Sequence, residues 1–153
     1  MAEELLDSQI TLGGEERRVS VLFSDIRNFT SVCERHSPGE ILGLLNIYFS
    51  QLSSVIDAHG GVIDKFIGDA LMALFGAPLA HPDDASRAVG AALCMIDALA
   101  DIKRELIARN LPALASGIGV NTGLVVAGNI GSPTRMNYTV VGDGVTWPLD
   151  WKA

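Results

Sequence analysis

The sequence predicts an α+β fold, in which a βαββαβ core followed by further strands forms a mainly antiparallel sheet with helices packed on one face. Short β-rich apolar segments alternate with two long amphipathic segments along the chain. Two of the β-rich segments are separated only by Gly68-Asp69, which is typical of a hairpin. The chain has 153 residues, of which 48% are hydrophobic, and this is enough for one core.

The first elements have clear local signals. Val19–Phe23 is a short β-rich run that predicts a buried strand. Ser37 and Glu40 have the spacing of a capping box, with Pro38 at the first helical position, so a helix is expected to begin there. An apolar stripe follows at helical spacing, and Gly60-Gly61 is expected to end the helix. The stripe consists of Ile41, Leu44, Leu45, Tyr48, Leu52, Val55 and Ile56.

The later elements follow in the same way. Residues 62–67 and 70–75 predict the two strands of the hairpin. Pro82-Asp83-Asp84 opens a second helix, which is acidic at its start and basic near its end, as the helix dipole favours. Glycine-punctuated β-rich segments predict three more strands, at 116–120, 124–130 and 138–141.

Composition and charge exclude several classes of protein. With 11 Lys and Arg against 18 Asp and Glu, the net charge is −7, so we expect no nucleic-acid partner held by a basic surface. The N-terminus lacks the pattern of a signal peptide, and uncharged runs such as 70–80 are too short for a direct membrane segment. Cys33 and Cys94 lack metal-binding spacing, which favours a cytoplasmic setting, although a longer parent protein could be membrane-tethered.

Two carboxylates stand at turns where a metal site could form. Asp25 follows the first strand, and Asp69 lies in the turn of the hairpin. Two carboxylates brought together repel each other unless a divalent cation binds between them, and Mg²⁺ takes one or two carboxylates with water and phosphate oxygens. Such an ion would let an acidic protein bind an anionic nucleotide. The alternative is that both are ordinary turn residues, since Asp is common in turns.

Four segments around these residues resemble motifs of the class III nucleotidyl cyclases, the adenylate and guanylate cyclase family. In order they are Val21–Thr30, similar to the first metal motif, Asp64–Ala73, similar to the second, and Gly117–Gly123 and Ala127–Ser132, similar to later core strands. The resemblance runs from about Arg17 to Val145 and is nearest to bacterial adenylate cyclases. It implies a ferredoxin-like core over residues 17–145, with residues 1–16 as a linker or the tail of an upstream segment.

The resemblance implies two-metal phosphoryl transfer. Asp25 and Asp69, assisted by the Ile26 carbonyl, would bind two Mg²⁺ or Mn²⁺ ions per site. These ions would lower the pKa of the ribose 3′-hydroxyl and hold the triphosphate, while the 3′-oxygen attacks the α-phosphorus. The substrate phosphates would lie along Arg27, Asn28, Phe29, Thr30 and Gly68. Asn28 stands where the family usually has glycine, but asparagine tolerates a positive φ better than most residues.

The family's two base-reading positions are Lys65 and Thr139 here, and this pair resembles the adenylate type. Adenine N1 accepts a hydrogen bond, which a lysine can donate, whereas guanine N1–H needs an acceptor such as glutamate. Without the family frame, Lys65 would be a solvated strand residue and Thr139 an ordinary β-branched one. Because this chain carries both the metal set and the base-reading set, a homodimer with active sites at its interface is implied, with ATP as substrate.

The resemblance stops after Val145. Thr146 and Asp150 occupy the positions of the family's transition-state asparagine and arginine, so residues 146–153 form an aberrant tail and the catalytic part is incomplete. A one-nucleotide deletion would account for this tail, and truncation or natural divergence are the alternatives. An acidic residue in place of a phosphate-binding arginine predicts weak activity or none.

The sequence therefore favours an adenylate cyclase domain that forms 3′,5′-cyclic AMP and pyrophosphate for cyclic nucleotide signalling. A non-catalytic nucleotide-binding or dimerisation module is the alternative from another class. A guanylate cyclase is less compatible with Lys65. The base-reading pair and the segment 121–123 argue against a diguanylate cyclase or a polymerase palm domain.

Overall fold

The structure is a computed structural model, and it describes residues 14–142. Its strands are β1 (Glu15–Ile26), β2 (Val62–Ile67), β3 (Ala70–Phe75), β4 (Ser116–Ser132) and β5 (Arg135–Val141), and its helices are α2 (Phe29–Arg35), α3 (Pro38–Ala58) and α4 (Asp84–Ala108). The strands form one sheet in the order β2-β3-β1-β4-β5, and each neighbouring pair is antiparallel. The expected α+β class and mainly antiparallel sheet are confirmed.

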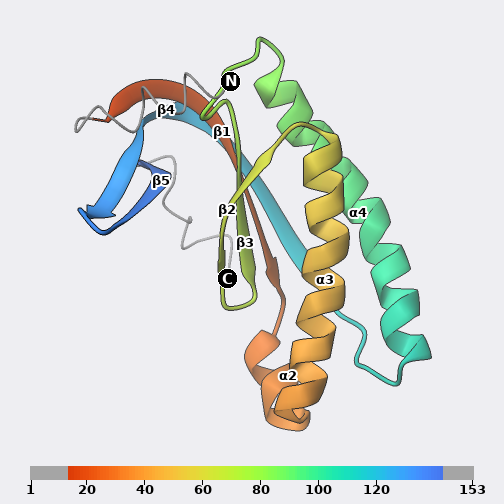
Figure 1. Cartoon of the computed structure of the whole chain (residues 1–153). Coiled ribbons are helices and arrows are strands. Elements are labelled where there is room, and N and C mark those ends of the chain that lie inside the picture. The colour runs from red at the N-terminus through yellow and green to blue at the C-terminus, as the bar shows by residue number, and fades with distance from the viewer. Residues whose placement is uncertain (1–13, 143–153) are drawn as a thin grey trace.

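Strand β3 and the second half of β1 are buried on both faces of the sheet, because alternate side chains of a strand point to opposite sides. On one side Leu22 and Phe75 pack with α3 and α4, which lie next to each other along the sheet in Figure 1. On the other side Val21 and Leu74 belong to a second apolar cluster formed by the sheet residues. The strand order places β1 at the centre of the sheet, with Asp25 near the end of that strand.

Helix α3 begins and ends at its predicted signals. The Ser37 hydroxyl accepts a hydrogen bond from the Glu40 amide, and the Glu40 side chain accepts one from the Ser37 amide, which together form the capping box. At the other end, Gly60 adopts a φ of 78°, a left-handed conformation that other residues adopt at a cost. Local sequence therefore sets both ends of this helix.

By length and composition alone, α3 is apolar enough to cross a membrane. This helix contains the uncharged run 41–56, which is longer than the run 70–80. In this fold Leu44, Tyr48, Leu52 and Ile56 have no solvent exposure and form the helix's contribution to the core. The apolar composition of α3 thus serves packing against the sheet.

Four elements differ from the sequence prediction, and one of them is β5, which begins at Arg135 rather than at residue 138. Strand β1 begins at Glu15, before the predicted start, since residues 15–18 pair with β4. The predicted strands 116–120 and 124–130 are one strand, because residues 121–123 continue the ladder with β1 and the Thr122 hydroxyl lies 2.7 Å from the Ser20 hydroxyl. Helix α2 was not predicted. A central strand obtains its hydrogen bonds from its neighbours, so tertiary pairing overrides local break signals.

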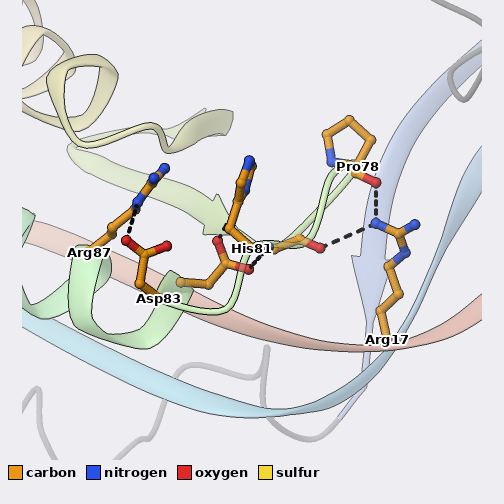
Figure 2. Close-up of polar contacts among 7 residues, drawn as sticks. Arg17, Pro78, His81, Asp83 and Arg87 are labelled. Atoms are coloured by element: carbon orange, nitrogen blue, oxygen red, sulfur yellow. Dashed lines mark hydrogen bonds and ion pairs between the residues drawn. The ribbon is translucent and has the colours of Figure 1, made fainter. Parts of the chain in front are cut away.

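One half-buried arginine holds the connection from β3 to α4. Arg17 on β1 donates hydrogen bonds to the carbonyl oxygens of Gly76 and Pro78, as Figure 2 shows for Pro78. Farther along, the carboxylate of Asp83 accepts a hydrogen bond from Arg87 at 2.9 Å, one turn into α4. These contacts fix the entry into α4 on the side of the sheet that carries the main core.

Candidate active site

The two aspartates meet at one corner of the sheet. Asp25 is the penultimate residue of β1 and is only 4% exposed. Asp69 lies in the tight turn between β2 and β3, where Gly68 adopts a φ of 60°. The Asp69 carboxylate accepts a hydrogen bond of 3.1 Å from the Ile26 amide, which belongs to the peptide that links Asp25 to Ile26. The pairing of β1 with β3 brings these residues together across 43 positions of sequence.

A network of hydroxyl groups, which runs from the buried Tyr48 through the half-buried Ser116, supports this corner. The Ser116 hydroxyl donates to the Asp25 carbonyl oxygen at 2.8 Å, and the Tyr48 hydroxyl lies 2.5 Å from Ser116. Because the Ser116 proton is donated to Asp25, the Tyr48 proton must be the one shared with Ser116. Burial raises the pKa of Tyr48 above its ordinary value, and the charges of Asp25 and Asp69 act in the same direction, so the phenol keeps this proton.

The turn after Asp25 has the backbone that the sequence required. Asn28 adopts a φ of 55° and a ψ of 34°, the left-handed conformation that its glycine-like position demanded. The Arg27 amide donates to the Ala115 carbonyl oxygen at 2.9 Å, which ties the turn to the segment before β4. Phe29 packs against the helical core, while Thr30 and Asn28 are exposed. Of the predicted phosphate-lining residues, Phe29 therefore has a packing contact as well.

The donor set at this corner fits a hard divalent cation. It offers two carboxylates, Asp25 and Asp69, beside the backbone of Ile26. Within residues 14–142, no group of three or more His, Cys, Asp or Glu side chains gathers into a metal-binding cluster. A set of one or two carboxylates completed by phosphate and water oxygens is the pattern typical of Mg²⁺, whereas zinc favours nitrogen and sulfur ligands.

The predicted base-reading residues also come together, although they lie on opposite edge strands. Lys65 lies on β2 and Thr139 on β5, and the curved sheet in Figure 1 brings those two edges toward each other. Both residues line a hollow of about 400 Å³. Asp64 joins them, since its Oδ2 accepts a hydrogen bond of 2.9 Å from Thr139 and lies 3.4 Å from the Lys65 ammonium.

Sequence reasoning missed three residues of this site. The sequence assigns no role to Asp64 beyond its place in the second motif, and it places Tyr48 only on the apolar stripe of a helix. Ser116 was the first residue of a strand. Tyr48 and Asp64 did carry a signal, since a phenol on an apolar stripe and a carboxylate inside a strand both need a buried partner. Thr146 and Asp150, the expected positions of the transition-state residues, lie outside the described residues.

The family follows from the sequence together with this geometry. The profile of the adenylate and guanylate cyclase catalytic domain matches residues 14–148, nearly the whole chain. The chain therefore belongs to this family of nucleotidyl cyclase domains.

Individual relatives agree with this assignment. The crystal structure of the guanylyl cyclase Cya2 has a TM-score of 0.85 and 47% identity, with 88% of this chain and 68% of that chain covered. The adenylyl cyclase CyaB from P. aeruginosa has a TM-score of 0.83 and 35% identity, with 88% and 70% covered. An uncharacterized protein of Mycobacterium tuberculosis, Rv1320c, is 40% identical over 136 residues, which are 88% of this chain and 22% of that protein. The chain thus spans about a fifth of the length of this relative.

Proposed function

We propose that the chain is an adenylate cyclase domain, which converts ATP to 3′,5′-cyclic AMP and pyrophosphate. The observation that carries the choice of ATP is the joining of Lys65 to Thr139 through Asp64. In the resemblance that the sequence carries, a lysine and a threonine at these positions are the adenylate type. Cytoplasmic cyclic nucleotide signalling is the corresponding role.

In this proposal, Asp25, Asp69 and the Ile26 carbonyl hold two divalent ions, Mg²⁺ or Mn²⁺. Such ions supply Lewis acidity, which lowers the pKa of the ribose 3′-hydroxyl and stabilises charge on the triphosphate. The bond from the 3′-oxygen to the α-phosphorus forms, the bond from the α-phosphorus to the bridging oxygen breaks, and the 3′-proton passes to solvent. Pyrophosphate leaves.

The residues of this chain bind and orient the substrate. The hydroxyl network of Tyr48 and Ser116 fixes the backbone at Asp25 and so preorganises the metal site. Gly68 and the turn Arg27–Thr30 lie beside the two aspartates in sequence and give the phosphates room. A homodimer, in which one subunit supplies the aspartates and the other Lys65 and Thr139, is the assembly that we propose.

Two other candidates each have an observation in their favour. A guanylate cyclase is favoured by the 47% identity to Cya2. A non-catalytic nucleotide-binding or dimerisation module is favoured by Thr146 and Asp150, which replace the asparagine and arginine of the family. For the same reason we expect slow turnover from this chain, because loss of a phosphate-stabilising arginine lowers rates by about 10³-fold or more.

The test measures binding and product formation by the 153-residue chain with Mn²⁺ and either ATP or GTP. We expect ATP to bind more tightly than GTP and cyclic AMP to form slowly. Asp69→Asn should abolish both the binding of nucleotide in the presence of Mn²⁺ and the formation of product. Asp57→Asn, on the exposed side of α3, should change neither. Tighter binding of GTP would favour the guanylate cyclase. ATP binding without any product, even over long incubations, would favour the non-catalytic module.

A further inference from the structure

Among the described residues, the carboxylate of Asp64 contacts both predicted base-reading side chains. Its Oδ2 accepts the Thr139 hydroxyl at 2.9 Å and faces the Lys65 ammonium at 3.4 Å. Asp64 and Thr139 are 75 positions apart and lie on the two edge strands of the sheet. The contact therefore depends on the curvature of the whole sheet.

A bulge in β2 makes this arrangement possible. Ile63 pairs with Ala73 of β3 and Lys65 pairs with Met72, so Asp64 is the extra residue between two neighbouring pairs. In a regular strand Asp64 and Lys65 would point to opposite faces, whereas a bulge re-aims one side chain. The Asp64 side chain is 3% exposed, while the Lys65 side chain is 45% exposed.

The buried carboxylate fixes the hydrogen-bonding polarity of its two neighbours. A carboxylate only accepts hydrogen bonds, so the Thr139 hydroxyl donates its single proton to Asp64. Thr139 then has only lone pairs to offer to a ligand in the hollow. Lys65 has three donors and no acceptor, and Asp64 uses one of those donors. Toward the hollow, the pair presents one acceptor and one donor.

With Lys65 facing N1 of the purine, as the resemblance implies, and Thr139 facing the neighbouring 6-substituent, this polarity matches adenine and opposes guanine. The Watson–Crick edge of adenine has a donor, the exocyclic amino group, next to an acceptor, N1. Guanine has the reverse order there, with O6 as acceptor and N1–H as donor. A site built to complete hydrogen bonds rejects an analogue that leaves its buried polar groups unpaired.

We infer that Asp64 is a positioning residue for base selection: by holding Thr139 as an acceptor and Lys65 as a donor, it makes the pair selective for adenine over guanine. The inference rests on the proposed function, because it assigns to Asp64 the orientation of the pair that reads the base. Asp64 itself does not contact the purine. Its effect passes through Thr139 and Lys65.

The experiment measures the dissociation constants of 3′-deoxy-ATP and 3′-deoxy-GTP with Mg²⁺ for the full chain. These analogues lack the attacking hydroxyl, so binding is measured without turnover. In Asp64→Asn, the amide can donate to Thr139 and the charge facing Lys65 is gone, so we expect the preference for the adenine analogue to fall about tenfold, the equivalent of one correctly polarised hydrogen bond. Asp97→Asn, the same change at an exposed position of α4, should leave the preference unaltered.

A second comparison separates positioning from a general structural effect. In a Thr139→Val background the hydroxyl is absent, so Asp64→Asn should change the preference clearly less than in the unsubstituted chain. Equal effects in both backgrounds would contradict the inference. Asp64→Ser, a smaller side chain with a donor, serves as an independent variant if Asp64→Asn unfolds, and it should lower the preference in the same direction.

Different results would contradict the proposed function and the role of Asp64. If the unsubstituted chain binds neither analogue, both the proposed function and the role of Asp64 are contradicted. If the chain prefers the adenine analogue and both Asp64 variants keep that preference, only the role of Asp64 is wrong.

Discussion

Removing a single oxygen from the hydroxyl network at Asp25 should measurably weaken the fold. Tyr48 has no solvent exposure, and its hydroxyl lies 2.5 Å from the Ser116 hydroxyl and 3.4 Å from that of Ser24. Tyr48→Phe keeps the ring and its apolar packing and removes only these polar contacts. The Ser116 hydroxyl would still donate to Asp25 but would lose the donor that it accepts from.

The magnitude follows from two terms. A typical hydrogen bond contributes about 1 kcal/mol net, and a buried hydroxyl left without a partner costs about 1–3 kcal/mol, whereas the phenyl ring fills most of the same space. We therefore expect Tyr48→Phe to lower the free energy of unfolding by about 2 kcal/mol. For a chain of this size that corresponds to a Tm lower by about 4–8 °C.

Urea unfolding followed by circular dichroism measures this change directly. The midpoint should fall while the m value stays constant, since the folded surface is the same. The matched control is Tyr138→Phe, because Tyr138 is the other tyrosine of the chain and is partly exposed. We expect that control to change stability by less than about 0.5 kcal/mol. An unchanged midpoint for Tyr48→Phe, or an equal loss in both variants, would refute the role of this network.

Two further predictions concern the ends and interior of α3. Gly61→Ala should destabilise the fold by about 1–3 kcal/mol, because the added Cβ would lie 2.6 Å from the Phe75 ring and 2.8 Å from Ile56, both of them buried. Gly43→Ala, where a Cβ meets nothing within 4 Å, should instead raise the free energy of unfolding by about 0.5–1 kcal/mol, and thermal melts of the pair should move in opposite directions. Hydrogen bonds from His36 and Ser37 lower the pKa of Glu40, so its contribution to stability is present above the pKa of the unfolded chain and is lost as pH falls through the lower, folded pKa. Melts of the unsubstituted chain and of Glu40→Gln should therefore differ at neutral pH and converge in acid, and a constant difference across that range would contradict the assignment.

Local sequence determined much of the fold. The capping box at Ser37 and Glu40 set the start of α3, and the hairpin strands 62–67 and 70–75 have their predicted bounds. These features depend on contacts between residues close in sequence, so short-range chemistry is enough to specify them. The left-handed conformation of Asn28 was expected from the resemblance, because glycine is usual at this position and asparagine tolerates a positive φ.

The sequence by itself also predicted the aspartates and the base-reading pair, because the order of motifs carries the resemblance to the family. What only the tertiary structure decided is how these residues meet. The curvature of the sheet brings its two edge strands together, and a bulge at Asp64 turns that carboxylate toward Thr139. In the same way, the pairing of β1 with β4 merged two predicted strands and placed Ser116 beneath Asp25. Hydrogen bonds between strands far apart in sequence form only after the chain has folded, and no local propensity encodes them.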